Sequence, residues 1–254
     1  MPMEDKMQVL SQRQLTKNIY ELVLKGQLVE QIEEPGQFVQ LLIPDASFVL
    51  RRPISIAFYN KKEQTLGLIY RQVGKGTEQL THLRAGDALI VFGPLGHGFP
   101  LKNKKTALLV GGGVGIPPLY ELACQLKDKG TDITMLMGVA TQEELFYQEA
   151  FSKVATVHIA SDDGSIGKKG HVGKLLAQLE LSYFDIVYSC GPKPMLQCVA
   201  STFSDKVDVY LSLEERMACG IGACYGCVVK QKNKEAQWKV CSDGPVFLAG
   251  EVEL

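Results

Sequence analysis

Four cysteines near the C-terminal end of the chain carry the clearest chemical signal. Three of them, Cys219, Cys224 and Cys227, form a C-x4-C-x2-C run, and the fourth is Cys241. This is the spacing of plant-type [2Fe–2S] ligation. Glycines between the ligands let backbone N–H groups approach the sulfurs without a Cβ in the way. The segment therefore predicts a one-electron site.

A structural zinc site is the main alternative for the same cysteines. Zinc also takes four thiolates, but its ligands usually come as two short C-x2-4-C pairs. The run C-x4-C-x2-C offers only one separate pair of this kind, because Cys224 is shared, and the lone Cys241 favours the cluster. Inert or disulfide-bonded cysteines are the third reading. The first residues show no apolar core of an export signal, so we expect reduced thiols and a cytoplasmic protein.

A glycine-rich loop in the second half of the chain suggests a nucleotide site. It follows the apolar run 106–110 and opens an expected helix, and its glycines are Gly111, Gly112, Gly113 and Gly115. Such a loop brings backbone close to a phosphate, and the helix N-terminus supplies free N–H groups. Because the pattern is not G-x-G-x-x-G, an ordinary tight β–α turn is the alternative.

A second loop, Cys190, Gly191 and Pro192, ends a later strand of the same half. Ligands of open α/β sheets bind at the carboxyl ends of strands, so this loop strengthens the nucleotide interpretation. Cys190 either contacts the ligand or is buried packing. No arginine follows the expected strand 133–139 to pair with a 2′-phosphate, which favours NAD over NADP.

Polar residues in the first half interrupt an apolar stretch at Arg52, Pro53, Ile54 and Ser55. An arginine can clamp a pyrophosphate, and a serine hydroxyl can hydrogen-bond a ring nitrogen. A solvated strand end is the alternative. Further weak signals of the same kind follow at Ile69, Tyr70, Arg71, Gly76 and Thr77.

The elements expected around these motifs divide the 254 residues into three parts. Residues 1–100 predict an antiparallel β-barrel with strands at 19–25, 37–43, 49–58, 65–71 and 87–92. Residues 101–213 alternate strands, at 106–110, 133–139, 154–160, 185–189 and 207–213, with helices at 117–129, 143–151, 173–179 and 194–203. This order predicts a parallel α/β domain. Residues 214–254 hold the cysteines and a hairpin that turns near Asn233.

Bulk properties exclude some classes of function. Apolar residues make up 46% and charged residues 22% of the chain, as in ordinary globular proteins. The net charge of −1 gives no electrostatic case for nucleic-acid binding. No apolar run approaches the length of about 18 residues that a membrane span needs.

The order of the motifs resembles the ferredoxin–NADP reductase superfamily. With the cysteine segment, the whole chain looks like the electron-transfer subunits of type B dihydroorotate dehydrogenases. The resemblance implies FAD on residues 52–55, 69–71, 76 and 77, NAD at the glycine loops, and a [2Fe–2S] cluster on the four cysteines. It also implies a catalytic partner that carries FMN, in a heterotetramer of two of each subunit. Ile54 departs from the superfamily, which has an aromatic residue there.

The expected function is therefore electron transfer from the FMN of the partner, through the cluster and FAD, to NAD⁺ in pyrimidine biosynthesis. No side chain of this chain is expected to be a catalytic acid or base. Two other functions stay open. The chain could be the flavin subunit of another NAD(P)-linked complex, such as a sulfhydrogenase or a bifurcating ferredoxin reductase. It could also be a non-catalytic nucleotide-binding module stabilised by zinc.

Overall fold

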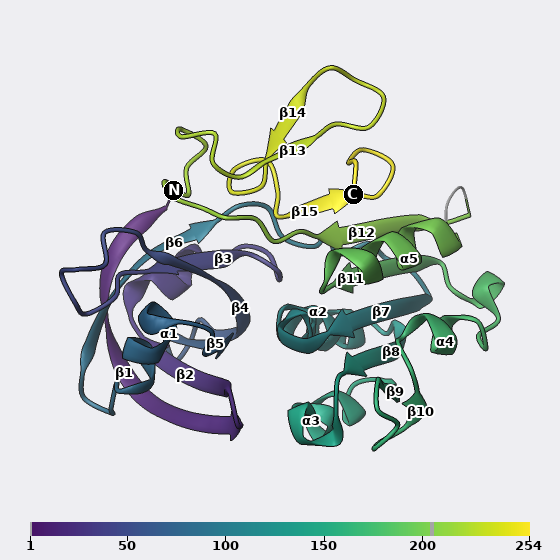
Figure 1. The fold of residues 1–254 in the computed structure, drawn as a ribbon, viewed down its shortest axis with the longest axis horizontal. Coiled ribbons are helices and arrows are strands. Elements are labelled where there is room, and N and C mark those ends of the chain that lie inside the picture. The colour runs from purple at the N-terminus through teal and green to yellow at the C-terminus, as the bar shows by residue number, and fades with distance from the viewer. Residues whose placement is uncertain (1, 204–205) are drawn as a thin grey trace.

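The computed structural model describes residues 2–203 and 206–254. A β-barrel and an α/β sheet lie side by side, and the C-terminal segment with its hairpin lies across the top of both (Figure 1). The predicted fold class, a β-barrel joined to a parallel α/β domain and a small cysteine-bearing segment, is confirmed. No helix of the described residues is long and apolar enough to cross a membrane.

The barrel is closed and antiparallel, with strand order β1-β2-β5-β4-β3-β6. Alternate residues of each strand point into the barrel, and these residues form its apolar core. The strands are β1 (Met3–Thr16), β2 (Ile19–Lys25), β3 (Phe38–Leu41), β4 (Arg52–Asn60), β5 (Thr65–Arg71) and β6 (Ala88–Leu95), with helix α1 (Lys75–Thr81) after β5.

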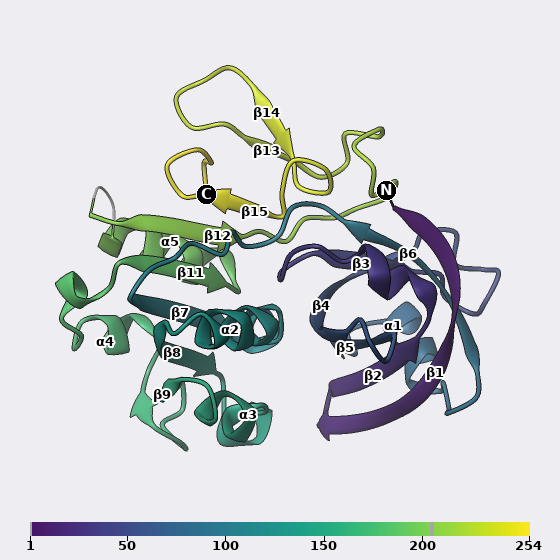
Figure 2. The same cartoon turned by 180° about the vertical axis from the view of Figure 1, so that it is seen from behind.

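The second sheet has the order β10-β9-β8-β7-β11-β12-β15 and is parallel except for the last strand. Helices α2 and α3 cover one face, and α4 and α5 cover the other (Figure 2). The strands are β7 (Thr106–Gly112), β8 (Asp132–Val139), β9 (Thr156–Ser161), β10 (Lys168–Lys169), β11 (Ile186–Cys190), β12 (Asp208–Ser212) and β15 (Val246–Leu248). The helices are α2 (Pro118–Asp128), α3 (Gln148–Ser152), α4 (Gly173–Leu176) and α5 (Lys193–Phe203).

The barrel packs against the α2 face of this sheet through a shared apolar cluster. Ile19, Ala57 and Ile69 of the barrel are buried with Leu119 and Leu122 of α2. Burial of apolar surface is the main favourable term in such packing. This packing brings the ends of β4 and β5 in the barrel close to the end of β7 in the larger sheet.

The C-terminal segment joins both parts. Strands β13 (Val228–Lys230) and β14 (Gln237–Lys239) form the predicted hairpin, with Asn233 at positive φ in its turn. Strand β15 then pairs antiparallel with β12 at the edge of the larger sheet. A fourth apolar cluster buries Cys227 and Cys241 against Phe38 and Leu95 of the barrel.

One expected helix and three unexpected strands are the main differences from the predicted elements. The helix predicted at 143–151 is broken: Tyr147 has φ 64°, and only Gln148–Ser152 is helical. The break lets the segment before α3 reach the barrel instead of continuing along the sheet. Strand β1, which was not predicted, alternates buried and exposed residues because only one face meets the barrel core. The short strands β10 and β15 were also not predicted.

Candidate redox site

The four cysteines are gathered into one loop region beside the hairpin. The N–H groups of Ala223 and Cys224 donate to Sγ of Cys219 over 3.3 and 3.4 Å. The N–H of Gly222 donates to Sγ of Cys241 over 3.2 Å, and that of Cys241 donates to Sγ of Cys227 over 3.4 Å. Backbone N–H groups directed at sulfur are the donors that stabilise thiolates and tune an iron–sulfur cluster.

These contacts shift the acidity of two thiols in opposite directions. Burial would raise the pKa of Cys219, but backbone N–H groups of Ile221, Cys224 and Ala223 lower it to about 6. Burial and the neighbouring thiol of Cys227 raise the pKa of Cys241 to about 12. The backbone N–H groups of its own loop thus favour the thiolate form of Cys219, which is the form that ligates a metal.

The four thiols interact with one another and differ in exposure. Cys219 interacts with Cys224, and Cys227 with Cys241. Cys227 and Cys241 are buried, Cys219 is half-buried, and Cys224 is exposed. Two of the four thiols are therefore enclosed by the protein, and only that of Cys224 is open to solvent.

The donor set fits an iron–sulfur cluster. Within residues 2–203 and 206–254, no three His, Cys, Asp or Glu side chains converge as ligands of a single ion. Four neighbouring thiols with backbone N–H groups directed at sulfur supply the ligands and the hydrogen-bond donors that a [2Fe–2S] cluster takes.

Residues predicted to bind FAD come together at the start of β4 and of α1. The Arg52 guanidinium lies against Gly76, since a Cβ there would be 2.7 Å from Nε. The same guanidinium lies 5.5 Å from the ring centroid of Phe48. Pro53, Ile54 and Ser55 are all half-buried, so this strand keeps an accessible side. An arginine beside glycine backbone is a suitable cradle for a pyrophosphate.

Other predicted FAD residues have their side chains occupied elsewhere. Tyr70 is buried in the barrel, where its hydroxyl accepts a hydrogen bond from Nε2 of Gln12 over 3.1 Å. The Thr77 hydroxyl accepts the N–H groups of Val73 and Gly74 within its own turn. Ile69 is buried between barrel and sheet. Only the backbone of these three residues is left to contact a ligand.

The two predicted NAD loops pack directly on each other. A Cβ on Gly115 would lie 2.2 Å from the carbonyl oxygen of Cys190, and one on Gly112 would lie 3.0 Å from Cδ of Pro192. Glycine is therefore required for the loops to meet at the carboxyl edge of the sheet. Burial raises the pKa of the Cys190 thiol to about 12. This favours the packing interpretation of Cys190.

Arg71 links the two predicted nucleotide sites. Its Nη2 pairs with Oε2 of Glu144 over 3.2 Å and lies 3.4 Å from the place of a Cβ on Gly113. Gly113, in turn, has φ +53°, which glycine adopts without strain. The end of β5 and the glycine loop after β7 thus meet at one arginine.

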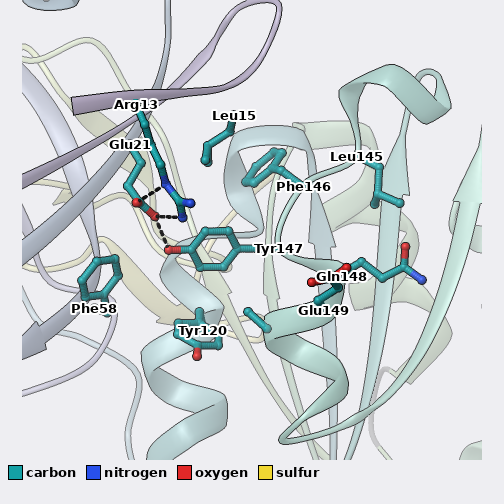
Figure 3. A pocket seen from close by; sticks show the side chains of 11 residues that line it. Arg13, Leu15, Glu21, Phe58, Tyr120, Leu145, Phe146, Tyr147, Gln148 and Glu149 are labelled. Atoms are coloured by element: carbon teal, nitrogen blue, oxygen red, sulfur yellow. Dashed lines mark hydrogen bonds and ion pairs between the residues drawn. The ribbon is translucent and has the colours of Figure 1, made fainter. Parts of the chain in front are cut away.

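A cleft of about 680 Å³ lies nearby, between the barrel and the segment before α3. Glu21 lines this cleft and pairs with Arg13 over 2.7 Å and with the Tyr147 hydroxyl over 2.7 Å (Figure 3). Phe58 and Tyr120 add aromatic walls. None of the predicted FAD or NAD residues lines this cleft, so we assign neither nucleotide to it.

Sequence reasoning missed Glu21, Glu144 and Tyr147. Each of these residues contacts a partner that is distant in sequence, and Tyr147 and Glu21 are 126 residues apart. The only local signal is that Glu21 is a charged residue in an apolar strand.

Comparison with known proteins agrees with this geometry. Residues 214–253 match the family model "Iron-sulfur cluster binding domain of dihydroorotate dehydrogenase B", and residues 109–201 match "Oxidoreductase NAD-binding domain". A solved NADH-dependent reduced ferredoxin-NADP oxidoreductase has a TM-score of 0.88 at 29% identity over 97% of this chain and 89% of its own. A ferredoxin-NADP⁺ reductase from Plasmodium falciparum, at 16% identity and a TM-score of 0.65, shares the fold over 83% of this chain and 96% of its own.

The barrel, the parallel sheet and the cysteine domain define a flavin-dependent reductase of the ferredoxin–NADP reductase fold with an added iron–sulfur domain. The electron transfer subunit of dihydroorotate dehydrogenase B (NAD(+)) from Geobacillus thermodenitrificans is 50% identical, with 98% of both chains covered. The Enterococcus faecalis V583 subunit is 46% identical over 99% of this chain and 98% of its own. The chain belongs to this family of electron transfer subunits. The predicted oxidoreductase class and the cofactor set of FAD, iron–sulfur cluster and NAD are confirmed.

Proposed function

We propose that this chain carries electrons between the FMN of a dihydroorotate dehydrogenase catalytic subunit and NAD⁺. When bound, the [2Fe–2S] cluster supplies one-electron transfer, and FAD converts it into the two-electron chemistry of nicotinamide. One observation carries the proposal. The cysteine loop lies on the outer face of β3, and β3 pairs with the strand that holds Arg52 to Ser55.

The residues of this chain have binding and positioning roles in the proposal. The cluster is held by Cys219, Cys224, Cys227 and Cys241, and the exposed Cys224 is directed to the partner. Arg52 neutralises the FAD pyrophosphate, and Ser55 hydrogen-bonds the flavin ring. The other contacts to FAD come from Pro53, Ile54, Arg71 and the backbone of Ile69, Tyr70, Gly76 and Thr77. NAD lies on Gly111, Gly112, Gly113, Gly115, Gly191 and Pro192, with Cys190 packed beneath it.

The partner is proposed as the FMN-containing catalytic subunit, in a heterotetramer of two of each. The Geobacillus and Enterococcus relatives are named electron transfer subunits of such an enzyme, which supports the partner. Three proposed domains follow the sequence boundaries: residues 1–100 for FAD, 101–213 for NAD, and 214–254 for the cluster. The three cysteines outside the proposed cluster, Cys124, Cys190 and Cys198, are not in disulfides, which supports the proposed cytoplasmic location.

The test compares NADH and dihydroorotate as reductants of the flavin. The purified chain with its cofactors should lose flavin absorbance with NADH and keep it with dihydroorotate. Adding the catalytic subunit should then make dihydroorotate effective. Bleaching by dihydroorotate without that subunit would overturn the proposed division of roles.

A bifurcating ferredoxin reductase remains a second candidate, because the NADH-dependent reduced ferredoxin-NADP oxidoreductase matches 97% of the chain. Its 29% identity is well below the 50% of the Geobacillus subunit. Co-purification decides between the two. An FMN-containing dehydrogenase as partner supports our proposal, and a different reductase or hydrogenase subunit contradicts it. A colourless preparation with one zinc per chain would contradict both.

A further inference from the structure

Strand β3 separates the barrel core from the cysteine domain. Val39 and Leu41 point inward and are buried in the barrel. Phe38 faces the other way and packs with Cys227 and Cys241. Since side chains alternate along a strand, Gln40 shares the outer face with Phe38. This outer face is the platform on which the cysteine domain rests.

Gln40 is the polar residue of this platform. It is 1% exposed, and its neighbours across the sheet are apolar, with Phe92 opposite it on β6. A buried amide is unfavourable unless its hydrogen bonds are made. If only packing mattered at position 40, an apolar side chain of the same size would fill the space equally well. The amide therefore calls for a specific partner.

That partner is the loop around Cys219. Nε2 of Gln40 donates to the carbonyl oxygen of Ala218 over 3.3 Å. On the other side of the cysteine, Gly220 has φ +72° and lies so close that a Cβ would be 2.9 Å from Cδ of Gln40. The Gln40 amide thus contacts the residues immediately before and after Cys219.

The position of this loop determines the environment of the sulfur. Sγ of Cys219 accepts N–H groups from Ala223 and Cys224 within the same loop. On the opposite strand, Gln40 pairs with Pro53 in the predicted FAD motif. One side chain therefore ties the cysteine loop to the strand next to the flavin site.

We propose that Gln40 is a positioning residue for the cluster: it holds the Cys219 loop on the flavin barrel and so determines the hydrogen bonding of the cluster and its placement relative to FAD. The inference rests on the proposed function, because it needs both cofactors in this chain. Mutation of a residue that positions a metal ligand typically lowers metal affinity or activity by about 10- to 100-fold.

The test compares the full-length chain with Gln40→Met, which keeps the length of the side chain but removes the donor. The measurements are the electron paramagnetic resonance spectrum of the chemically reduced cluster and the half-time of iron release to a chelator. We expect the FAD content of the wild type, shifted g values, and iron release on the order of tenfold faster. Gln40→Asn has a side chain too short to reach Ala218 and should show the same changes. It replaces Gln40→Met as the test if that variant does not fold.

Thr131→Val is the matched control. It also removes a buried side chain to backbone hydrogen bond, from Thr131 to the Lys104 carbonyl over 2.9 Å, but lies in the α/β part. It should leave the spectrum and the iron release unchanged. Wild-type behaviour of both Gln40 variants, or equal changes in Thr131→Val, would overturn the role of Gln40 alone. A wild-type chain without iron would instead overturn the proposed function.

Discussion

The hydroxyl of Tyr147 donates a 2.7 Å hydrogen bond to Oε2 of Glu21, joining the α/β part to the barrel (Figure 3). Arg13 pairs with the other carboxylate oxygen, so the buried charge of Glu21 is compensated from both sides. Tyr147 reaches this position with φ 64°, a conformation uncommon for residues other than glycine. The contact holds the segment that also places Glu144 beside Arg71.

Removing this hydroxyl should loosen the contact between barrel and sheet. Tyr147→Phe leaves a buried carboxylate with one donor fewer, so we expect a loss of about 1–2 kcal/mol in the free energy of unfolding. Flavin reduction by NADH should also slow, since Arg71, which lies between the two proposed nucleotide sites, pairs with Glu144 in the same segment as Tyr147. Urea denaturation and stopped-flow absorbance measure the two effects.

Tyr183→Phe is the control for this prediction. Its hydroxyl also donates to a carboxylate over 2.7 Å, that of Asp132, but at an exposed site. It should change stability by less than about 0.5 kcal/mol. If both variants lose equal stability, Tyr147 has no special role in joining the two parts.

Gly115 is predicted to be intolerant of any side chain. A Cβ would lie 2.2 Å from the Cys190 carbonyl oxygen, so Gly115→Ala must push the two glycine loops apart. Overpacking of this kind costs about 1–3 kcal/mol, and binding of NADH should weaken as well. Gly250→Ala meets nothing within 4 Å and should change neither property. Calorimetry of NADH binding and thermal unfolding give the comparison, and equal behaviour of the two variants would contradict the close packing.

Cys190 should be inert at neutral pH. Burial of the side chain raises the pKa of this thiol to about 12, above the ordinary value of a free thiol. Between these two values, the folded protein keeps the proton that the unfolded chain releases. The stability that this thiol contributes is complete below about pH 8.5 and is lost as the pH rises towards 12. At pH 8, iodoacetamide followed by mass spectrometry should label Cys190 only after denaturation. Rapid labelling in the folded protein would show that the site is open.

Cys241 is predicted to be the fourth ligand. Cys241→Ser should lose most of the iron and the visible absorbance of the cluster while FAD remains bound. Cys198→Ser, at a half-buried position on α5, should keep both cofactors. Iron and flavin assays on the two proteins decide the point. Full iron content in Cys241→Ser would remove this residue from the ligand set.

Local patterns were sufficient for most elements of the fold. Strands β2 and β5 lie at the predicted residues, and β7, β8 and α2 differ from prediction by one or two residues at their ends. These strands are short apolar runs bounded by turn residues, and α2 has an apolar face with a period of 3.6. Strand β1 was missed because much of it faces solvent, and its pairing with β2 and β6 is what closes the barrel.

The amino-acid sequence by itself determined the cofactor motifs, because the cysteine spacing and the glycine loops act over a few neighbouring residues. The tertiary structure alone decided how these motifs meet. Arg71 lies beside Gly113, Tyr147 interrupts its expected helix to reach Glu21, and Gln40 contacts the loop of Cys219 across 178 residues of chain. Such contacts depend on strand pairing and on burial between parts of the chain that are far apart, and no local pattern encodes either.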